Sequence, residues 1–294
     1  MANTIVLKRR IASIRNMRQI TKAMQLVSAS KLRRAQDYAA RSRAYRELAY
    51  ELLMRLSAIR EVEQHALFVK RPVKRRLYII VTSNSGLAGA YNANVLKQLT
   101  KLITADREAH ISSSVIAVGT KGAQFVRRLQ DVELKAVYPA FGDRPETRDV
   151  QPILASIVDS YTKAEVDDVR ILYTFSKSSI SQEVRDLSIL PAEKLEAADD
   201  EAEAKPLPDM ATFEPDVETV IAQIATRLIE AQVWQAILEG LASEHSMRMV
   251  AMKNATDNAN ELIEDYTLEY NTARQAAITQ ELAEITGGAE ALNG

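Results

Sequence analysis

The residues numbered 244–285 form a long run without proline or glycine, the residues that most often interrupt helices. Small and apolar side chains recur along it at alternating intervals of four and three, the spacing of one helix face. They are Ala259, Ile263, Tyr266, Tyr270, Ala273 and Ala277, continued by Ile278, Leu282 and Ile285, and preceded by Val220, Ile224, Leu228, Ala231, Trp234, Leu238 and Leu241. The pattern predicts a helix over 217–285, about 100 Å long. The paired glycines beyond Ile285 predict its end.

A helix of this length cannot bury its apolar stripe alone, and the start of the chain offers a partner. Residues 1–71 also lack proline and glycine, Thr4 is a candidate N-cap, and Pro72 marks the expected end. The predicted apolar face comprises Ile11, Ile14, Met17, Ile20, Met24 and Val27, and resumes at Tyr45, Leu48, Leu52, Leu56 and Ile59. The two ends of the chain are therefore expected to form an antiparallel coiled coil with a domain inserted between them.

Charge is divided along the chain in a way that suits this pairing. Residues 1–76 carry 19 basic and 5 acidic side chains, whereas residues 192–294 carry 6 basic and 21 acidic ones. Opposite charges beside a seam favour pairing of the two helices, and a basic surface could also face an acidic partner. The chain has no cysteine, which excludes disulfides and thiolate metal sites, and its three histidines are widely separated. No cofactor or metal is expected.

The middle of the chain changes to the pattern of an α/β domain. Short apolar runs predict strands over 76–82, 113–118, 134–137, 169–175 and 183–190, and helices over 92–104, 123–129 and 153–163. Strands that alternate with helices form a mostly parallel sheet with crossover helices. The expected organisation is a coiled-coil helix over 1–71, a Rossmann-like α/β domain over 72–192, an acidic linker over 193–216 and a second coiled-coil helix over 217–294. No run of apolar residues approaches the length of a membrane span.

The glycines of the middle domain do not match phosphate-binding fingerprints. The first loop has the spacing Gly86-x-x-Gly89 and the second has Gly119-x-x-Gly122, and neither is a dinucleotide fingerprint or a P-loop. Tight turns between strands and helices are the more common use of such pairs. No nucleophile and base are visibly grouped, so catalysis by this chain is not expected.

Polar residues interrupt the last helix at Asn254, Asp257, Asn258 and Glu261. If these side chains lie in the seam, they either control its register or make contacts that form and break. The spacing alone does not decide between these interpretations.

Four stretches together resemble the gamma subunit of F-type ATP synthases. They are ITKAM at 20–24 with VSASK at 27–31, the loop region 82–92, the run 244–258 with MRMVAMK at 247–253, and ARQAAITQEL at 273–282. Their order and spacing extend the resemblance over essentially the whole chain. The sequence departs from the family at 84–90, which reads NSGLAGA where the family usually has a motif like DRGLCGG, and at Gly287, where the family usually has serine or alanine.

The resemblance implies a non-catalytic rotor subunit. The paired helices would pass through a hexamer of alpha and beta subunits, and the α/β domain would contact epsilon and the c-ring. Rotation driven by protons would be coupled to the catalytic sites of beta. The absence of cysteine excludes a dithiol switch, and no transit peptide is visible. The expected location is therefore the cytoplasmic face of a bacterial plasma membrane, reached through the complex.

The resemblance also implies contact residues. Lys22 and Met24 lie in the ITKAM motif and are expected to meet the moving part of beta. The C-terminal candidates, expected to face the inner loops of the hexamer, are Arg248, Arg274, Gln275, Thr279 and Glu281. Three other functions are alternatives to the rotor: a separate coiled-coil interaction protein, a nucleic-acid-binding arm, and an enzyme in the α/β domain.

Overall fold

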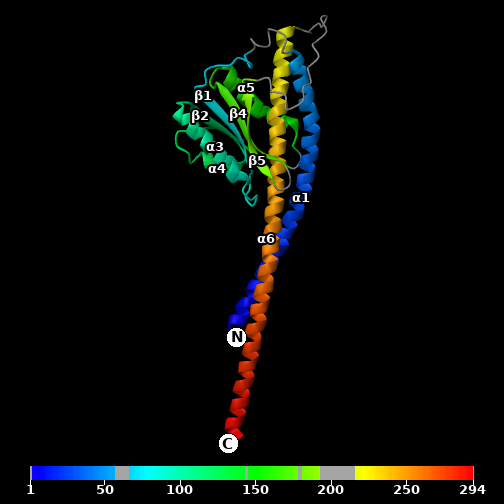
Figure 1. The fold of residues 1–294 in the computed structure, drawn as a ribbon, viewed down its shortest axis with the longest axis vertical. Coiled ribbons are helices and arrows are strands. Elements are labelled where there is room, and N and C mark those ends of the chain that lie inside the picture. The colour runs from blue at the N-terminus through cyan, green and yellow to red at the C-terminus, as the bar shows by residue number, and fades with distance from the viewer. Residues whose placement is uncertain (1, 57–65, 143–144, 178–180, 193–215, 294) are drawn as a thin grey trace. The chain divides into compact units, whose positions relative to one another are not determined.

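The computed structural model describes residues 2–56, 66–142, 145–177, 181–192 and 216–293. The chain forms two compact units, which we call the helix-pair unit (residues up to 28 and from 248 onwards) and the α/β unit (residues 29–247). Helices α1 (Ala2–Leu56) and α6 (Val217–Asn293) each contribute to both units (Figure 1). The predicted acidic linker lies outside the described residues, apart from Asp216.

The α/β unit contains a five-stranded sheet in the order β3-β2-β1-β4-β5. Its strands are β1 (Arg75–Val81), β2 (Ser112–Val118), β3 (Glu133–Tyr138), β4 (Asp168–Ser176) and β5 (Gln182–Leu190). The connecting helices are α3 (Tyr91–Glu108), α4 (Thr120–Val126) and α5 (Gln151–Thr162), the last preceded by the 3-10 turn η1 (Thr147–Val150). β1 to β4 are parallel and β5 is antiparallel to β4. The predicted α/β fold is confirmed.

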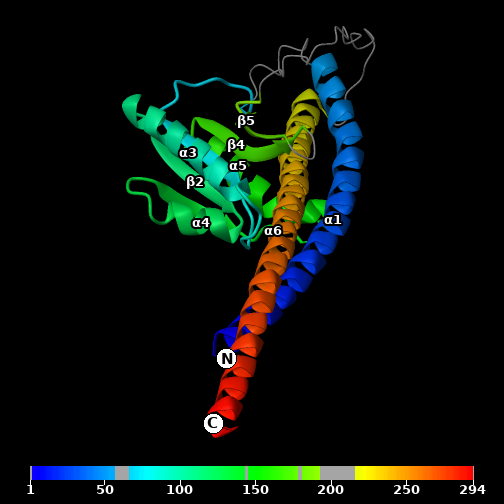
Figure 2. The same ribbon diagram turned by 60° about the horizontal axis from the view of Figure 1, so that its bottom comes forward.

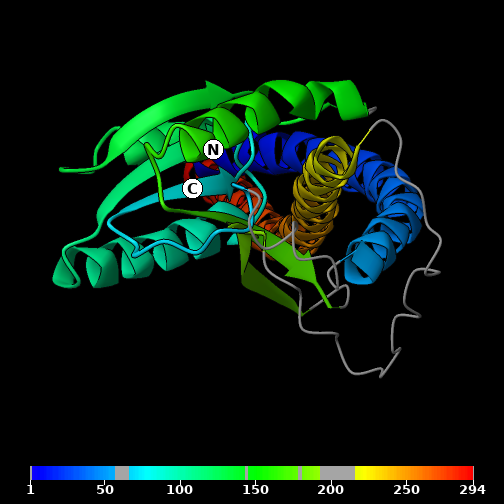
Figure 3. The same ribbon diagram turned by 90° about the horizontal axis from the view of Figure 1, so that it is seen from above.

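The sheet is covered on both faces, because its strands alternate their side chains between two cores. Leu77, Ile79 and Val81 of β1 face a core that includes α5, whereas Tyr78 and Ile80 face a core that includes α3 and α4. Figure 3 shows α5 and α3 on opposite sides of the sheet. Buried apolar residues on both faces explain why the strands read as continuous apolar runs.

Helix α6 is part of the core of the α/β unit. Its residues Ala225, Ile229 and Val233 belong to the same buried cluster as α5 and the sheet. Farther along, Leu241 and Ala242 pack against Ala35 of α1, and the two helices run side by side there (Figure 2). From 228 to 246 every residue of α6 except the half-buried Trp234 is buried. The helix therefore has no solvent face over this length, which an amphipathic stripe alone would not predict.

Within the helix-pair unit, α1 and α6 are antiparallel. The Thr256 hydroxyl donates to the Thr21 hydroxyl at 2.8 Å, Arg18 donates to Asn260 at 3.3 Å, and Arg10 lies over the Tyr266 ring. Contacts closer to the start of α1 are thus made farther along α6. The face predicted for α6 is confirmed from 259 to 277, since its six positions there are all buried or half-buried.

The face predicted for α1 is only partly right. Ile11, Ile14 and Met24 are buried or half-buried, but Met17, Ile20 and Val27 have exposed fractions of 57%, 61% and 54%. Repeated steps of three residues rotate the stripe by about 60° each on a helix, so the predicted stripe turns away from the partner. The buried positions instead follow alternating steps and include hydroxyl and small residues. Among the described side chains of α1 they are Leu7, Ile11, Thr21, Ser28, Ala35, Ala39 and Ser42.

Other predictions for the helices are wrong or lie outside the described residues. Asn254, Asp257, Asn258 and Glu261 are exposed, so neither interpretation as seam residues holds. Thr4 is inside α1 rather than before it, because the helix already begins at Ala2. Leu48 is exposed, and the side chains of Tyr45, Leu52 and Leu56, with Ile59, are not described.

Helix α6 does not end at its paired glycines. It continues through Gly287 and Gly288 to Asn293. A glycine in a helix costs about 1 kcal/mol relative to alanine, so it weakens the helix without breaking it. The prediction of a helix end at Ile285 is therefore wrong. At its start, Asp216 caps α6 by accepting hydrogen bonds from the backbone N–H and the hydroxyl of Thr219, both at 2.8 Å.

Candidate interaction surface

All seven residues that the resemblance singled out lie in the helix-pair unit. Lys22, Arg274, Gln275, Thr279 and Glu281 have exposed side chains, and Met24 is half-buried. Arg248 differs, because only 9% of it is exposed. Most of this residue is buried within the chain, and its role as a partner contact stays a prediction.

The last turns of α6 carry apolar side chains that no other described segment of the helix-pair unit covers. Ile278, Leu282 and Ile285 are exposed to 48%, 60% and 69%. The two helices are antiparallel and Arg10 lies over Tyr266, so α1 reaches its first residue within the next turns of α6. The rest of α6 extends past the start of α1 (Figure 1). The sequence placed these residues in the seam, but they lie on the surface.

Charged and apolar side chains share one face of these turns. Steps of four, three and four residues connect Arg274, Ile278, Glu281 and Ile285, and such steps return to the same side of a helix. The Thr279 hydroxyl donates to the Gln275 carbonyl at 3.0 Å, so its hydrogen is used within the helix. An apolar strip with charged neighbours is the composition of a protein-binding surface.

Helix α1 adds exposed apolar residues that the sequence analysis had assigned to its packing face. Met17, Ile20, Leu26 and Val27 are all more than half exposed. Met17, Ile20 and Val27 lie within about a quarter turn of one another, since ten residues of an α-helix make nearly three turns. The apolar residues in this part of the sequence recur at repeated intervals of three, which do not match the alternating intervals of a helix face buried against a partner. This spacing is the signal that they face outward. Exposed apolar patches of this kind mark interaction sites.

At the carboxyl ends of the parallel strands, the polar groups of the loops form hydrogen bonds with one another. The Asn84 side-chain oxygen accepts from the backbone N–H groups of Thr120 and Ala140, at 3.2 and 3.0 Å. The Thr82 hydroxyl donates to the Val118 carbonyl and accepts from the Gly122 N–H. This edge is where α/β sheets usually bind ligands. Here its hydrogen bonds hold the two turns together, as expected for glycine pairs with a structural role.

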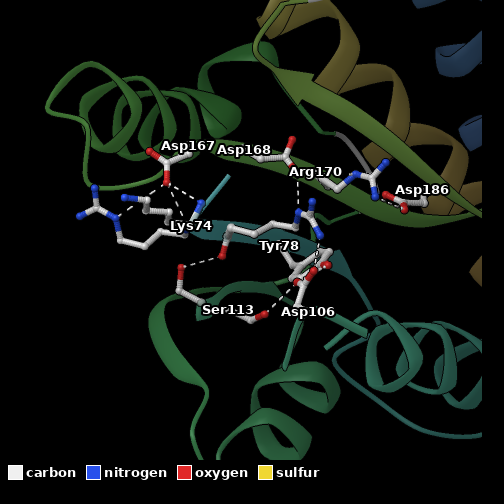
Figure 4. Close-up of polar contacts among 11 residues, drawn as sticks. Lys74, Tyr78, Asp106, Ser113, Asp167, Asp168, Arg170 and Asp186 are labelled. Carbon is white, nitrogen blue, oxygen red and sulfur yellow. Dashed lines mark hydrogen bonds and ion pairs between the residues drawn. The ribbon is translucent and has the colours of Figure 1, made fainter. Parts of the chain in front are cut away.

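A polar network lies at the opposite edge of the sheet (Figure 4). Arg76 forms ion pairs with Asp106 and Asp168, and the Tyr78 hydroxyl donates to Asp106 at 2.7 Å. Burial raises the pKa of the Asp168 carboxyl, although Arg76 beside it acts in the opposite direction. Burial also raises the pKa of the Tyr78 hydroxyl. Each charged group in this network has a partner, so its role is to join α3 to β1 and β4.

The described residues form no cluster of acidic or histidine side chains suited to a metal ion. No helix in the described parts of the chain is long and apolar enough to cross a membrane. The surface with the strongest case for a function is therefore the exposed part of the helix-pair unit. It can bind a partner through apolar and charged contacts.

Comparison with known proteins gives one consistent result. A family profile described as ATP synthase matches residues 3–292. The ATP synthase gamma chain of Desulfitobacterium hafniense is 40% identical over 292 residues, which are 99% of this chain and 100% of that one. The gamma chain of Staphylococcus saprophyticus is 37% identical, over 96% of both chains.

Solved structures agree with the sequence relatives. A chain of the Tetrahymena thermophila mitochondrial ATP synthase central stalk and c-ring structure has a TM-score of 0.62 and 25% identity, over 80% of this chain and 99% of that one. A chain of the Euglena gracilis mitochondrial ATP synthase has a TM-score of 0.69 over 99% of this chain and 95% of that one. Its identity of 21% supports the fold alone.

An α/β sheet packed on long paired helices is a fold shared with the central stalk of ATP synthases. The relatives narrow this class further. The chain belongs to the ATP synthase gamma-chain family, and it is the central-stalk rotor subunit of that enzyme.

Proposed function

We propose that this chain performs no chemistry itself and transmits torque through α6 to partners that contact its exposed turns. The observation that carries the proposal is the apolar face of Ile278, Leu282 and Ile285, which the described part of the helix-pair unit leaves exposed. In the complex this face would lie against the inner loops of the alpha and beta hexamer. Lys22, Met24, Arg274, Gln275, Thr279 and Glu281 are proposed as further contacts.

Torque requires that the helix and the α/β unit turn together. The buried cluster that contains Ala225, Ile229 and Val233 packs α6 against α5 and the sheet. Rotation of α6 within this core would expose these side chains to water, which costs a free energy of about 25 cal/mol for each Å² of apolar surface exposed. Force applied to the α/β unit is therefore transferred into α6, which runs unbroken to Asn293.

A rotor must also present different faces to identical partners. One side of the last turns carries Arg274 and Glu281 with the apolar strip, and the exposed apolar residues of α1 add another surface. A beta subunit that meets the apolar face has a different contact energy from one that meets a polar face. This difference shifts the conformational equilibrium of each catalytic site in turn.

The partners follow from this role. The hexamer of alpha and beta subunits would surround the helix-pair unit, and epsilon and the c-ring would bind the α/β unit. Proton flow through the membrane sector would drive rotation, coupled to ATP synthesis or hydrolysis on beta. The chain would be held peripherally at the cytoplasmic face of a bacterial plasma membrane through the complex. The bacterial relatives support this location.

The proposal can be tested by co-expressing a tagged form of this chain with the alpha and beta subunits of the same source. We expect one copy of the chain in each purified hexamer, and an ATPase rate that depends on its presence. Native mass determination and a coupled ATPase assay measure both. A soluble chain that never joins the hexamer would contradict the rotor proposal and favour a separate interaction protein.

Replacing Arg274 and Gln275 together by alanine is expected to lower coupled ATPase and ATP synthesis roughly five- to thirtyfold, because two polar contacts of about 0.5–1 kcal/mol each are lost. Both side chains are exposed in the chain itself, so its unfolding free energy should change by less than about 0.5 kcal/mol. Turnover in the reconstituted complex and thermal unfolding of the chain are the two measurements.

The control for this prediction is the double alanine variant of Gln124 and Arg128, an exposed pair in the α/β unit. It removes the same chemical groups away from the helix-pair unit, so coupled rates should stay near those of the unchanged protein. If the Arg274 and Gln275 variant has unchanged turnover, these residues do not contact the hexamer. If both variants lose activity equally, the loss has a cause other than the exposed end of α6.

A further inference from the structure

A cavity of about 700 Å³ lies in the α/β unit, between α1, the η1 segment and α6. Its volume is within the range of pockets that hold small molecules, roughly 300–1,000 Å³. It is lined by Tyr38, Arg41 and Ser42 of α1, by residues 145–148, and by Arg227, Glu230, Ala231 and Trp234 of α6. None of these residues belongs to the exposed surface of the helix-pair unit or to the polar network at the sheet edge.

Three guanidinium groups line the cavity, and they are not equivalent. Arg148 forms an ion pair with Glu146 at 2.8 Å, and Arg227 forms one with Glu230 at 2.7 Å. Arg41 makes no ion pair or hydrogen bond with any other residue that the structure describes. The lining therefore carries one positive charge more than its carboxylates neutralise. A guanidinium group presents a planar set of donors that fits phosphate or carboxylate oxygens.

Ser42 supplies a second polar group beside Arg41. Only 8% of Ser42 is exposed, and its hydroxyl has no hydrogen-bond partner among the described residues. Elsewhere on α1 the Ser28 hydroxyl donates back to the Met24 carbonyl at 2.7 Å, the usual solution for a buried serine in a helix. A buried hydroxyl without a partner costs about 1–3 kcal/mol. A change of the Ser42 rotamer turns its hydroxyl into the cavity, where a ligand oxygen would recover this cost.

Aromatic rings complete the lining. Tyr38 comes from α1 and Trp234 from α6. Phe141 packs edge-on against the Trp234 ring, with centroids 6.3 Å apart, and this contact limits its motion. A fixed aromatic ring near a guanidinium group favours a planar ligand that also carries negative charge, because stacking on the ring adds to the ion pair.

We propose that this cavity binds a small organic phosphate with a planar ring, of the nucleoside monophosphate class. The phosphate is held by Arg41 and the Ser42 hydroxyl, and the ring lies against Trp234. The bound molecule connects α1, the η1 segment and α6 of the α/β unit, so its occupancy stabilises their packing. This site is separate from the nucleotide sites that the hexamer would provide.

Trp234 is the only tryptophan of the chain, so its fluorescence reports directly on this cavity. The full chain, purified without alpha and beta, is titrated with adenosine monophosphate, with inorganic phosphate and with adenosine. We expect a saturable fluorescence change with adenosine monophosphate. Phosphate and adenosine should each bind at least about tenfold more weakly, since each lacks one of the two contacts. The melting temperature should rise with the concentration of the monophosphate.

Arg41→Ala is expected to weaken binding of adenosine monophosphate at least about tenfold, because a charge-assisted hydrogen bond is lost. Ser42→Ala should weaken it less. The matched control is Arg33→Ala, which removes an exposed arginine of the same helix that does not line the cavity, and should leave binding unchanged. Arg41 is exposed, so Arg41→Ala should melt near the temperature of the unchanged chain without ligand.

Three results would overturn the proposal. The first is the lack of any saturable change with adenosine monophosphate up to about 10 mM, which corresponds to a binding free energy weaker than about 3 kcal/mol. The second is equal affinity for the monophosphate and for phosphate, which would exclude a ring contact. The third is unchanged binding in Arg41→Ala, which would place the ligand elsewhere. If Arg41→Ala itself melts early, Ser42→Ala provides the same comparison.

Discussion

Replacement of Asp106 by alanine is expected to lower the unfolding free energy by about 3–5 kcal/mol, the cost of removing one partner of a buried ion pair. Asp106 is 2% exposed and forms an ion pair with Arg76. Its carboxylate also accepts hydrogen bonds from Tyr78 at 2.7 Å and from Ser113 at 2.9 Å. Alanine would leave one buried donor, the Tyr78 hydroxyl, and two half-buried donors, Arg76 and Ser113, without this acceptor, so the loss exceeds the value of any one bond.

Asp131→Ala is the matched control for this prediction. Asp131 pairs with Arg107 at 3.6 Å, and both side chains are well exposed. An exposed pair of this kind contributes about 0–1 kcal/mol, and the left-handed backbone at Asp131, with φ of 63°, adds about 1 kcal/mol for alanine. The total loss should therefore stay below that of Asp106→Ala. Urea denaturation of the full chain, followed by circular dichroism, measures both variants. Equal midpoints for Asp106→Ala and Asp131→Ala would contradict the view that the network at the sheet edge stabilises the α/β unit.

The sheet was predictable because its signals are local. Each parallel strand is a short apolar run between turn residues, and each crossover helix follows it directly. The position of α6 in the core could not be read in the same way. Ala225 and Ile229 of α6 contact a sheet whose last strand ends at Leu190, more than 30 residues earlier in the sequence. No local pattern of residues predicts a contact over this separation. In the sequence, burial of the helix on all sides from 228 to 246 appears only as the absence of one clear apolar face.

The helix pair was predicted unevenly for a related reason. From 259 to 277 the face of α6 keeps strict alternation of four and three, and this part of the face is buried or half-buried in the structure. In α1 the buried positions include Thr21 and Ser28, which do not look like core residues in a sequence. Their small side chains permit close approach, as in the hydrogen bond between Thr21 and Thr256. Apolar residues such as Ile20 are then left on the surface.

The contact residues depended on resemblance, since no chemical pattern marks a rotor surface. Arg274 and Gln275 came from a family motif, and exposure is what the structure adds to them. Arg248 came from another stretch of the resemblance, MRMVAMK at 247–253, and only 9% of it is exposed. Ile278, Leu282 and Ile285 were assigned to the seam because α6 was expected to be paired along its length. Helix α1 begins alongside an earlier part of α6, so these residues have no partner helix in the described parts of the chain and stay exposed. The spacing of apolar residues does not show where the partner helix begins.

The backbone conformation at residue 119 explains why the sequence has glycine at this position. It follows β2 with φ of +100° and ψ of 141°, a region that residues with a side chain rarely enter. A Cβ atom here would lie 2.1 Å from the Thr82 carbonyl oxygen, which is far inside van der Waals contact. The Gly119 N–H also donates to the Tyr138 carbonyl at 2.8 Å, so the backbone is held from two sides. The loop cannot shift without breaking that bond.

Gly119→Ala is therefore expected to lower the unfolding free energy by about 3 kcal/mol or more, as backbone strain of 1–3 kcal/mol adds to a comparable cost of overpacking. Gly86→Ala, in the neighbouring loop, is the control, because no atom lies within 4 Å of its added methyl group. It should change stability by less than about 1 kcal/mol. Thermal and urea unfolding of both variants give the comparison. Similar stability in the two would mean that the turn after β2 adapts freely, and that the glycine pair is not required by the close packing of β1 against β2.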